Sequence, residues 1–75
     1  MKSRIREIFA EVLEVELAVI TDTLEYSSIP QWDSVAHMAI VAAIEDEYDI
    51  MMEIDDIIDM SDFTKSVEII STYID

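Results

Sequence analysis

Apolar side chains near the start of the chain recur at steps of three and four residues, and this spacing predicts an amphipathic helix. The helix is expected to run from Arg4 to about Val15. Because residues spaced in this way share one side of a helix, that side should pack into a core. Its members are Ile5, Ile8, Phe9, Val12 and Leu13.

A second helical pattern follows Asp33 and Ser34 and ends at Tyr48. The face expected to enter the core carries Met38, Val41, Ile44 and Tyr48. Another face descends directly from Ser34 and bears small apolar residues followed by an acid, namely Val35, Ala39, Ala42 and Asp46. We call these four residues the docking stripe, because a smooth surface suits a partner protein. Close packing of another helix would favour the same small residues.

Two more helices are expected in the last third of the chain. Residues 55–60 predict a short helix whose acids lie in the first turn, where they suit the helix dipole. Ser61 or Asp62 can cap the last helix. The side chains that face inward from this helix are expected to be Phe63, Val67, Ile70 and Ile74.

A long connection, residues 16–31, separates the first two helices. Connections of this length are usually functional or disordered, but this one carries spaced apolar residues that predict attachment to the core. They are Leu17, Ile20, Leu24 and Ile29, with Trp32 just beyond. No segment shows the alternation typical of a strand, so the pattern predicts an all-helical fold.

Composition limits the size and chemistry of the protein. A chain of 75 residues makes one domain, 1–75, with a thin core. It contains no cysteine, which excludes a disulfide, a thiolate zinc site and a thiol catalyst. The first residues lack the apolar run of a signal peptide, and no apolar run is long enough to cross a bilayer. We therefore expect a soluble cytoplasmic protein that does not insert into membranes, and we expect it to be a monomer.

A net charge of −14 restricts the partners of the protein. Its four basic residues lie near the ends of the chain, and they are Lys2, Arg4, Arg6 and Lys65. The resulting field repels nucleic acids and anionic membranes and attracts proteins with basic docking surfaces. A simpler interpretation is that the acids only keep the protein soluble.

The sequence contains no convincing catalytic or metal site. His37 follows Ser34 by three residues, which invites a Ser–His interpretation. However, no glycine-rich turn is present to form an oxyanion hole, and the domain is small for a substrate cleft. We therefore expect no enzyme and place His37 on the surface, near whatever is attached to Ser34. An EF-hand loop needs a glycine that the chain lacks, so its acids could hold divalent cations only loosely.

The order of helices around Trp32-Asp33-Ser34-Val35 resembles an acyl carrier protein. This tetrapeptide is similar to the Asp-Ser-Leu attachment motif of that family, with valine in place of leucine. The segment Glu45-Asp46-Glu47-Tyr48-Asp49-Ile50 resembles the family's acidic run, which ends in an aromatic residue followed by an aliphatic one. The segment Phe63-Thr64-Lys65-Ser66-Val67 resembles the opening of its last helix. The resemblance covers nearly the whole chain.

The resemblance implies a four-helix bundle with a long first loop and a short third helix. It also implies a 4′-phosphopantetheine arm on Ser34, with Asp33 as part of the motif, installed from coenzyme A by a magnesium-dependent phosphopantetheinyl transferase. The other expected partners are acyl-loading and acyl-using enzymes with basic surfaces, which would dock on the docking stripe. Adaptable methionines between the helices could help to shelter a bound acyl chain, and the candidates are Met38, Met51, Met52 and Met60.

The departures from the family pattern leave alternatives open. Ala36 and Ala39 stand where carriers of fatty-acid synthesis usually place acids, which suggests partners that differ from the general fatty-acid synthase set. The expected pathway is a fatty-acid-like pathway of lipid metabolism or a specialised one, such as one for polyketides or polysaccharides. A carrier of peptidyl or D-alanyl groups is a second possibility within the superfamily. An unmodified acidic helical adaptor that binds a basic partner is the alternative from another class.

Overall fold

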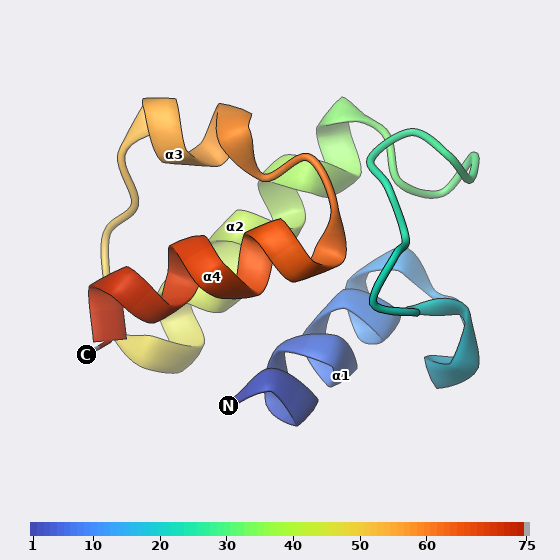
Figure 1. The fold of residues 1–75 in the computed structure, drawn as a ribbon, viewed down its shortest axis with the longest axis horizontal. Coiled ribbons are helices and arrows are strands. Elements are labelled where there is room, and N and C mark those ends of the chain that lie inside the picture. The colour runs from blue at the N-terminus through green and yellow to red at the C-terminus, as the bar shows by residue number, and fades with distance from the viewer. Residues whose placement is uncertain (75) are drawn as a thin grey trace.

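A computed structural model describes residues 1–74 of the chain. These residues form four α-helices and a short 3₁₀-helix, with no strand beyond an isolated bridge between Glu25 and Asp62. The helices are α1 (Lys2–Leu13), η1 (Leu17–Val19), α2 (Ser34–Tyr48), α3 (Ile54–Asp59) and α4 (Phe63–Ile74). The expected all-α bundle, with its long first loop and short third helix, is confirmed (Figure 1).

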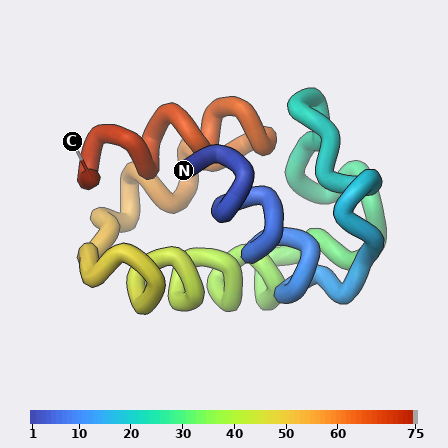
Figure 2. Tube along the Cα trace, turned by 90° about the horizontal axis from the view of Figure 1, so that it is seen from below, coloured from blue at the N-terminus to red at the C-terminus, as the bar shows by residue number. Residues whose placement is uncertain are grey.

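The helices surround one core, and the long loop covers one end of it. α2 and α4 run in the same direction, while α1 runs in the opposite direction and packs on α2 (Figures 1 and 2). The loop between α1 and α2 lies at the end of the bundle where α2 begins (Figure 2). This arrangement places the start of α2 beside the loop, while α3 lies alongside α4 with its beginning near Tyr73, at the C-terminal end of α4 (Figure 1).

Three aromatic side chains join the loop to α1 and α4 in the core. Phe9 makes edge-to-face contacts with Trp32 and with Phe63, each with ring centroids 5.2 Å apart. All three side chains are fully buried. Their neighbours in the core include Ile5, Leu13, Ile20, Ile40, Val41, Ile44, Met60 and Ile70.

The long loop is attached to the core, as its apolar residues predict, except at its beginning. Ile20, Leu24 and Trp32 are buried, whereas Leu17 is 49% exposed, so its expected attachment is wrong. The Arg6 guanidinium donates to the Ile20 carbonyl, and it lies 4.6 Å from the centre of the Phe63 ring. These polar contacts hold the loop where its sparse apolar residues alone would leave it loose.

The buried face of α2 differs from the expected one. Val41 and Ile44 are buried as predicted, but Met38 is 54% exposed, and His37 and Ile40 are buried in its place. In α4, similarly, Ser66 and Ile69 are buried while Ile74 is 37% exposed. The reason in α2 is that its core face meets α1 and Trp32, which leaves Met38 on the side of the helix that looks toward α3.

Candidate functional site

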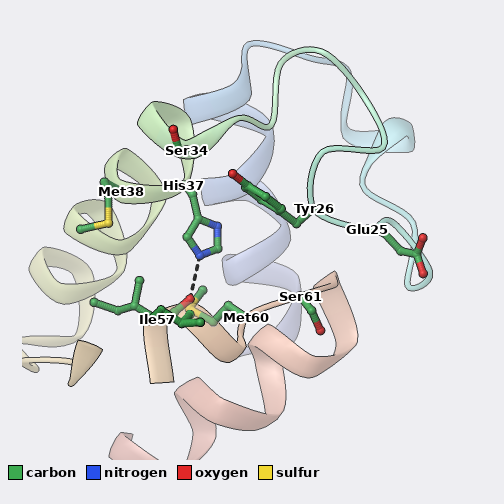
Figure 3. A pocket seen from close by; sticks show the side chains of 9 residues that line it. Glu25, Tyr26, Ser34, His37, Met38, Ile57, Met60 and Ser61 are labelled. Atoms are coloured by element: carbon green, nitrogen blue, oxygen red, sulfur yellow. Dashed lines mark hydrogen bonds between the residues drawn. The ribbon is translucent and has the colours of Figure 1, made fainter. Parts of the chain in front are cut away.

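Ser34 is the first residue of α2, and Asp33 fixes this start. The Asp33 backbone is extended, and its side chain accepts a hydrogen bond of 2.9 Å from the Ala36 amide. Ser34 itself is exposed, and Figure 3 shows its hydroxyl pointing away from His37. Trp32, two residues earlier, is completely buried. An anchored residue and a cap therefore hold the serine hydroxyl outward at a defined position.

An open groove of about 510 Å³ begins at Ser34 and separates α2 from α3 and the loop. Its walls are mostly apolar and come from Met38 on α2 and from Ile57 and Ile58 on α3. Figure 3 shows Met38 and Ile57 on these two helices. The other lining residues are Glu25, Tyr26, His37, Met60 and Ser61. Of the four methionines expected to shelter a chain, Met38 and Met60 line this groove, Met52 is buried, and Met51 is 85% exposed.

His37 is buried between the loop, α2 and α3, so its expected position on the surface is wrong. Its Nδ1 accepts a hydrogen bond of 2.9 Å from the Trp32 indole, and its Nε2 lies 2.9 Å from the Ile57 carbonyl oxygen. An indole N–H can only donate and a carbonyl can only accept. The neutral imidazole therefore carries its proton on Nε2, whose bond to Ile57 is drawn in Figure 3, and both ring nitrogens have partners.

These hydrogen bonds also exclude the arrangement needed for a Ser–His pair. Neither nitrogen of His37 is free to take a proton from Ser34, and the serine hydroxyl points the other way. The buried position had one signal in the sequence. A buried tryptophan needs an acceptor for its N–H, and His37 is five residues from Trp32.

The docking stripe is exposed along α2. Val35 is 78% exposed, and Ala39, Ala42 and Asp46 are also exposed, so no other helix of the described chain packs on these residues. Val35 and Ala39, the first two residues of the stripe, border a second hollow of about 490 Å³ between the end of α1 and the start of α2. A role of the stripe in docking stays a prediction.

Three of the four basic side chains are paired with acids. Lys2 and Arg6 pair with Asp22 at 3.1 and 2.7 Å, and Arg4 pairs with Glu47 at 3.0 Å. The hydrogen bonds from Arg6, mainly, and from Lys2 lower the pKa of the Asp22 carboxyl.

The acidic helix α3 is attached to α4 through one tyrosine hydroxyl. Tyr73 donates to the Asp56 carboxylate and accepts from the Glu53 amide at 3.0 Å. The bond to Asp56 raises the pKa of Tyr73. No group of three or more acidic or histidine side chains within residues 1–74 is placed to hold a metal ion. None of the helices in this range is long and apolar enough to span a membrane.

Comparison with protein-family models identifies one family. The model described as the phosphopantetheine attachment site matches residues 3–64. The chain belongs to this family. The family is defined by covalently attached 4′-phosphopantetheine, and membership confirms the resemblance to acyl-carrier-type proteins. A comparison with curated proteins gives no match.

The residues at the start of α2 fit this group. The Ser34 hydroxyl is exposed and therefore accessible to a modifying enzyme. A phosphate attached there would lie at the N-terminus of a 15-residue helix, where the helix dipole favours negative charge. The first turn of α2 contains no acidic side chain to oppose it. The groove beside Ser34 offers an apolar surface along which an attached arm could lie.

Proposed function

We propose that Ser34 is the attachment residue and that this chain is a discrete carrier of acyl groups. The observation that supports the proposal is an exposed serine, held by the Asp33 cap at the start of α2 and opening onto an apolar groove. The thiol of the phosphopantetheine arm would hold each acyl group as a thioester. The chain itself supplies an anchor and a surface, and we propose that it is not an enzyme.

The attachment reaction needs no base from this chain. The Ser34 oxygen forms a bond to the pantetheine-bearing phosphorus of coenzyme A, the pyrophosphate bond breaks, and adenosine bisphosphate leaves. The phosphopantetheinyl transferase, with its magnesium ion, takes the hydroxyl proton. His37 is not needed as a base in this reaction, and both of its ring nitrogens already have hydrogen-bond partners.

The partners in this proposal recognise α2. Val35, Ala39, Ala42 and Asp46 lie in one exposed row that starts beside Ser34. The net charge of −14 favours enzymes with basic docking surfaces. We propose that the chain acts as one monomeric carrier domain in the cytoplasm, where it receives its arm from the transferase and its cargo from acyl-loading enzymes.

The pathway is a finer part of the proposal. Ala36 and Ala39 are the residues that separate this chain from carriers with an acidic stripe, and they favour a specialised pathway over general fatty-acid synthesis. Polyketide and polysaccharide-related pathways are the examples we consider. A peptidyl or D-alanyl carrier remains the alternative, and it would require a partner that adenylates an amino acid.

Intact-mass analysis tests the attachment directly. The full chain is incubated with coenzyme A, magnesium and a broad-specificity phosphopantetheinyl transferase, and we expect a gain of one phosphopantetheine mass. Ser34→Ala should gain nothing. Ser61→Ala is the matched control, because Ser61 is another exposed serine that lines the same groove, and it should react like the wild type. Absence of the gain would contradict the proposal and support the unmodified adaptor, whereas a gain in Ser34→Ala would place the arm on another residue.

A further inference from the structure

We propose that His37 restricts the cargo of this carrier to short acyl groups by closing the seam between α2 and α3. By the seam we mean the line of contact between these two helices, where the His37 side chain reaches the Ile57 carbonyl. Short acyl groups would lie in the open groove, and a long alkyl chain would find no entry to the core behind it. This inference rests on the proposed attachment at Ser34 and names the class of acyl group that this site accepts.

The seam is closed by a side chain that contacts both of its walls. His37 belongs to α2, yet its Nε2 donates to the Ile57 carbonyl of α3 at 2.9 Å. The imidazole lies edge to edge with the Trp32 indole, which donates to its Nδ1, with 19° between the two planes, and it is roughly perpendicular to the Tyr26 ring, with centroids 5.3 Å apart. Figure 3 shows the imidazole crossing from α2 to α3 in the groove that opens at Ser34. Only 8% of His37 is exposed.

The space behind His37 is filled. Trp32 beside it and Phe63 in the same core are fully buried, and Met60, which also lines the groove, is 1% exposed. Protein cores are packed to the density of organic crystals, so an alkyl chain can enter only where side chains move aside. The α3 helix is held on its other side as well, because Tyr73 of α4 binds Glu53 and Asp56.

Opening the seam would leave polar groups without partners. A chain that displaced His37 would separate it from the Trp32 indole and the Ile57 carbonyl, and an alkyl group can replace neither hydrogen bond. Buried donors and acceptors without partners are costly, and this cost offsets the gain from burying further methylene groups. A longer acyl chain therefore gains little binding free energy from the carrier.

The open groove suits a short acyl group instead. Its apolar wall is formed by Met38, Ile57 and Ile58, and Tyr26 and Ser61 also line it. In Figure 3 the Tyr26 hydroxyl lies at the end of its ring nearest Ser34. A cargo of a few carbons with a hydrogen-bonding group could use both kinds of surface without disturbing His37.

The test uses a series of arms on the full-length protein. Acetyl, butyryl, octanoyl and dodecanoyl forms are made from the corresponding coenzyme A thioesters with a broad-specificity transferase, and intact mass confirms each. In the wild type we expect Tm to change by less than about 2 °C from butyryl to dodecanoyl. We also expect hydroxylamine to cleave all four thioesters at similar rates, because none is sheltered. A steady rise of Tm with chain length, or slower cleavage of the long chains, would overturn the inference.

Variants at His37 connect the effect to this residue. His37→Leu removes the hydrogen bonds that close the seam, and its Tm should rise by about 5 °C or more from acetyl to dodecanoyl. His37→Gln can still accept from Trp32 and donate to Ile57, so it should behave like the wild type. Met51→Ala is the control, since Met51 is 85% exposed and does not line the groove, and its series should match that of the wild type.

The outcomes separate this inference from the proposed function. If no form gains an arm, the attachment at Ser34 fails and the selection by His37 fails with it. If every arm is attached and the wild type still shelters the dodecanoyl chain, only the inference about His37 is wrong. The wild-type series decides this even if His37→Leu does not fold.

Discussion

The hydrogen bond between Trp32 and His37 should be one of the most costly side-chain contacts to remove. Trp32→Phe keeps an aromatic ring but deletes the N–H that His37 Nδ1 accepts at 2.9 Å. An acceptor left buried without its donor costs about 1–3 kcal/mol. The missing part of the indole, at a site that is 0% exposed, leaves a small cavity that costs about 1 kcal/mol more.

Together these effects amount to about 2–4 kcal/mol. A chain of this length has a total stability of roughly 4–11 kcal/mol, so the variant loses a large share of it. The expected fall in Tm is roughly 10–30 °C. Chemical unfolding followed by circular dichroism measures the change, because Trp32 is the only tryptophan and its fluorescence is lost in the variant.

A double-mutant cycle tests the reason for the loss. His37→Leu alone leaves the Trp32 N–H and the Ile57 carbonyl unpaired, whereas Trp32→Phe with His37→Leu removes donor and acceptor together. The double variant should therefore be about 1–2 kcal/mol more stable than the sum of the two single losses implies. Additivity within about 0.5 kcal/mol, or a Trp32→Phe variant as stable as the wild type, would refute the reasoning.

Three further predictions concern caps, burial and pH. Asp33→Ala should lower stability by about 1 kcal/mol by removing the cap of α2, while Asp33→Asn should not, as thermal melts followed by circular dichroism can show. Tyr48 has the one buried side-chain polar atom in residues 1–74 that lacks a partner, so Tyr48→Phe should raise stability by about 0.5–1 kcal/mol in urea titrations. The Arg6 guanidinium lowers the pKa of Asp22 in the folded state, which means that the pair stabilises the fold above the ordinary pKa of 3.8 and ceases to do so as pH falls through the lowered value. Asp22→Asn should accordingly melt below the wild type at neutral pH, with the difference in Tm shrinking in acid; a difference that stays constant would contradict this account.

The sequence predicts the parts of the fold that follow from spacing and local chemistry. The apolar face of α1 is largely where its periodicity places it, with Ile5, Ile8, Phe9 and Leu13 buried. The start of α2 follows from Asp33, because an aspartate before a helical run satisfies a free backbone amide. An exposed Ser34 is a direct consequence of that cap. These features need no knowledge of tertiary contacts.

The sequence does not predict which side of α2 is buried, and the reason is physical. Apolar residues occur around almost the whole helix, from Val35 and Met38 to Ile40 and Val41, so periodicity alone does not select a face. Which face of α2 is buried depends on the indole N–H of Trp32 in the loop, because its hydrogen bond to Nδ1 allows His37 to be buried. Met38 is then turned toward the groove. Whether a polar residue can be buried depends on its hydrogen-bond partners. The periodicity of apolar residues gives no information about a partner such as the Ile57 carbonyl, which is 20 residues away.

The junction at His37 joins three parts of the molecule that the proposed function requires to act together. The loop provides the indole, α3 provides the carbonyl, and α2 carries both the imidazole and, three residues earlier, the serine. A change that moves α3 must therefore break or rebuild hydrogen bonds one helical turn from Ser34. Since the groove lies between the same elements, the position of the cargo and the stability of the fold depend on the same two hydrogen bonds. His37→Leu should thus change chain-length preference and Tm together, whereas His37→Gln, which keeps both hydrogen bonds, and Met51→Ala, outside the groove, should change neither by much.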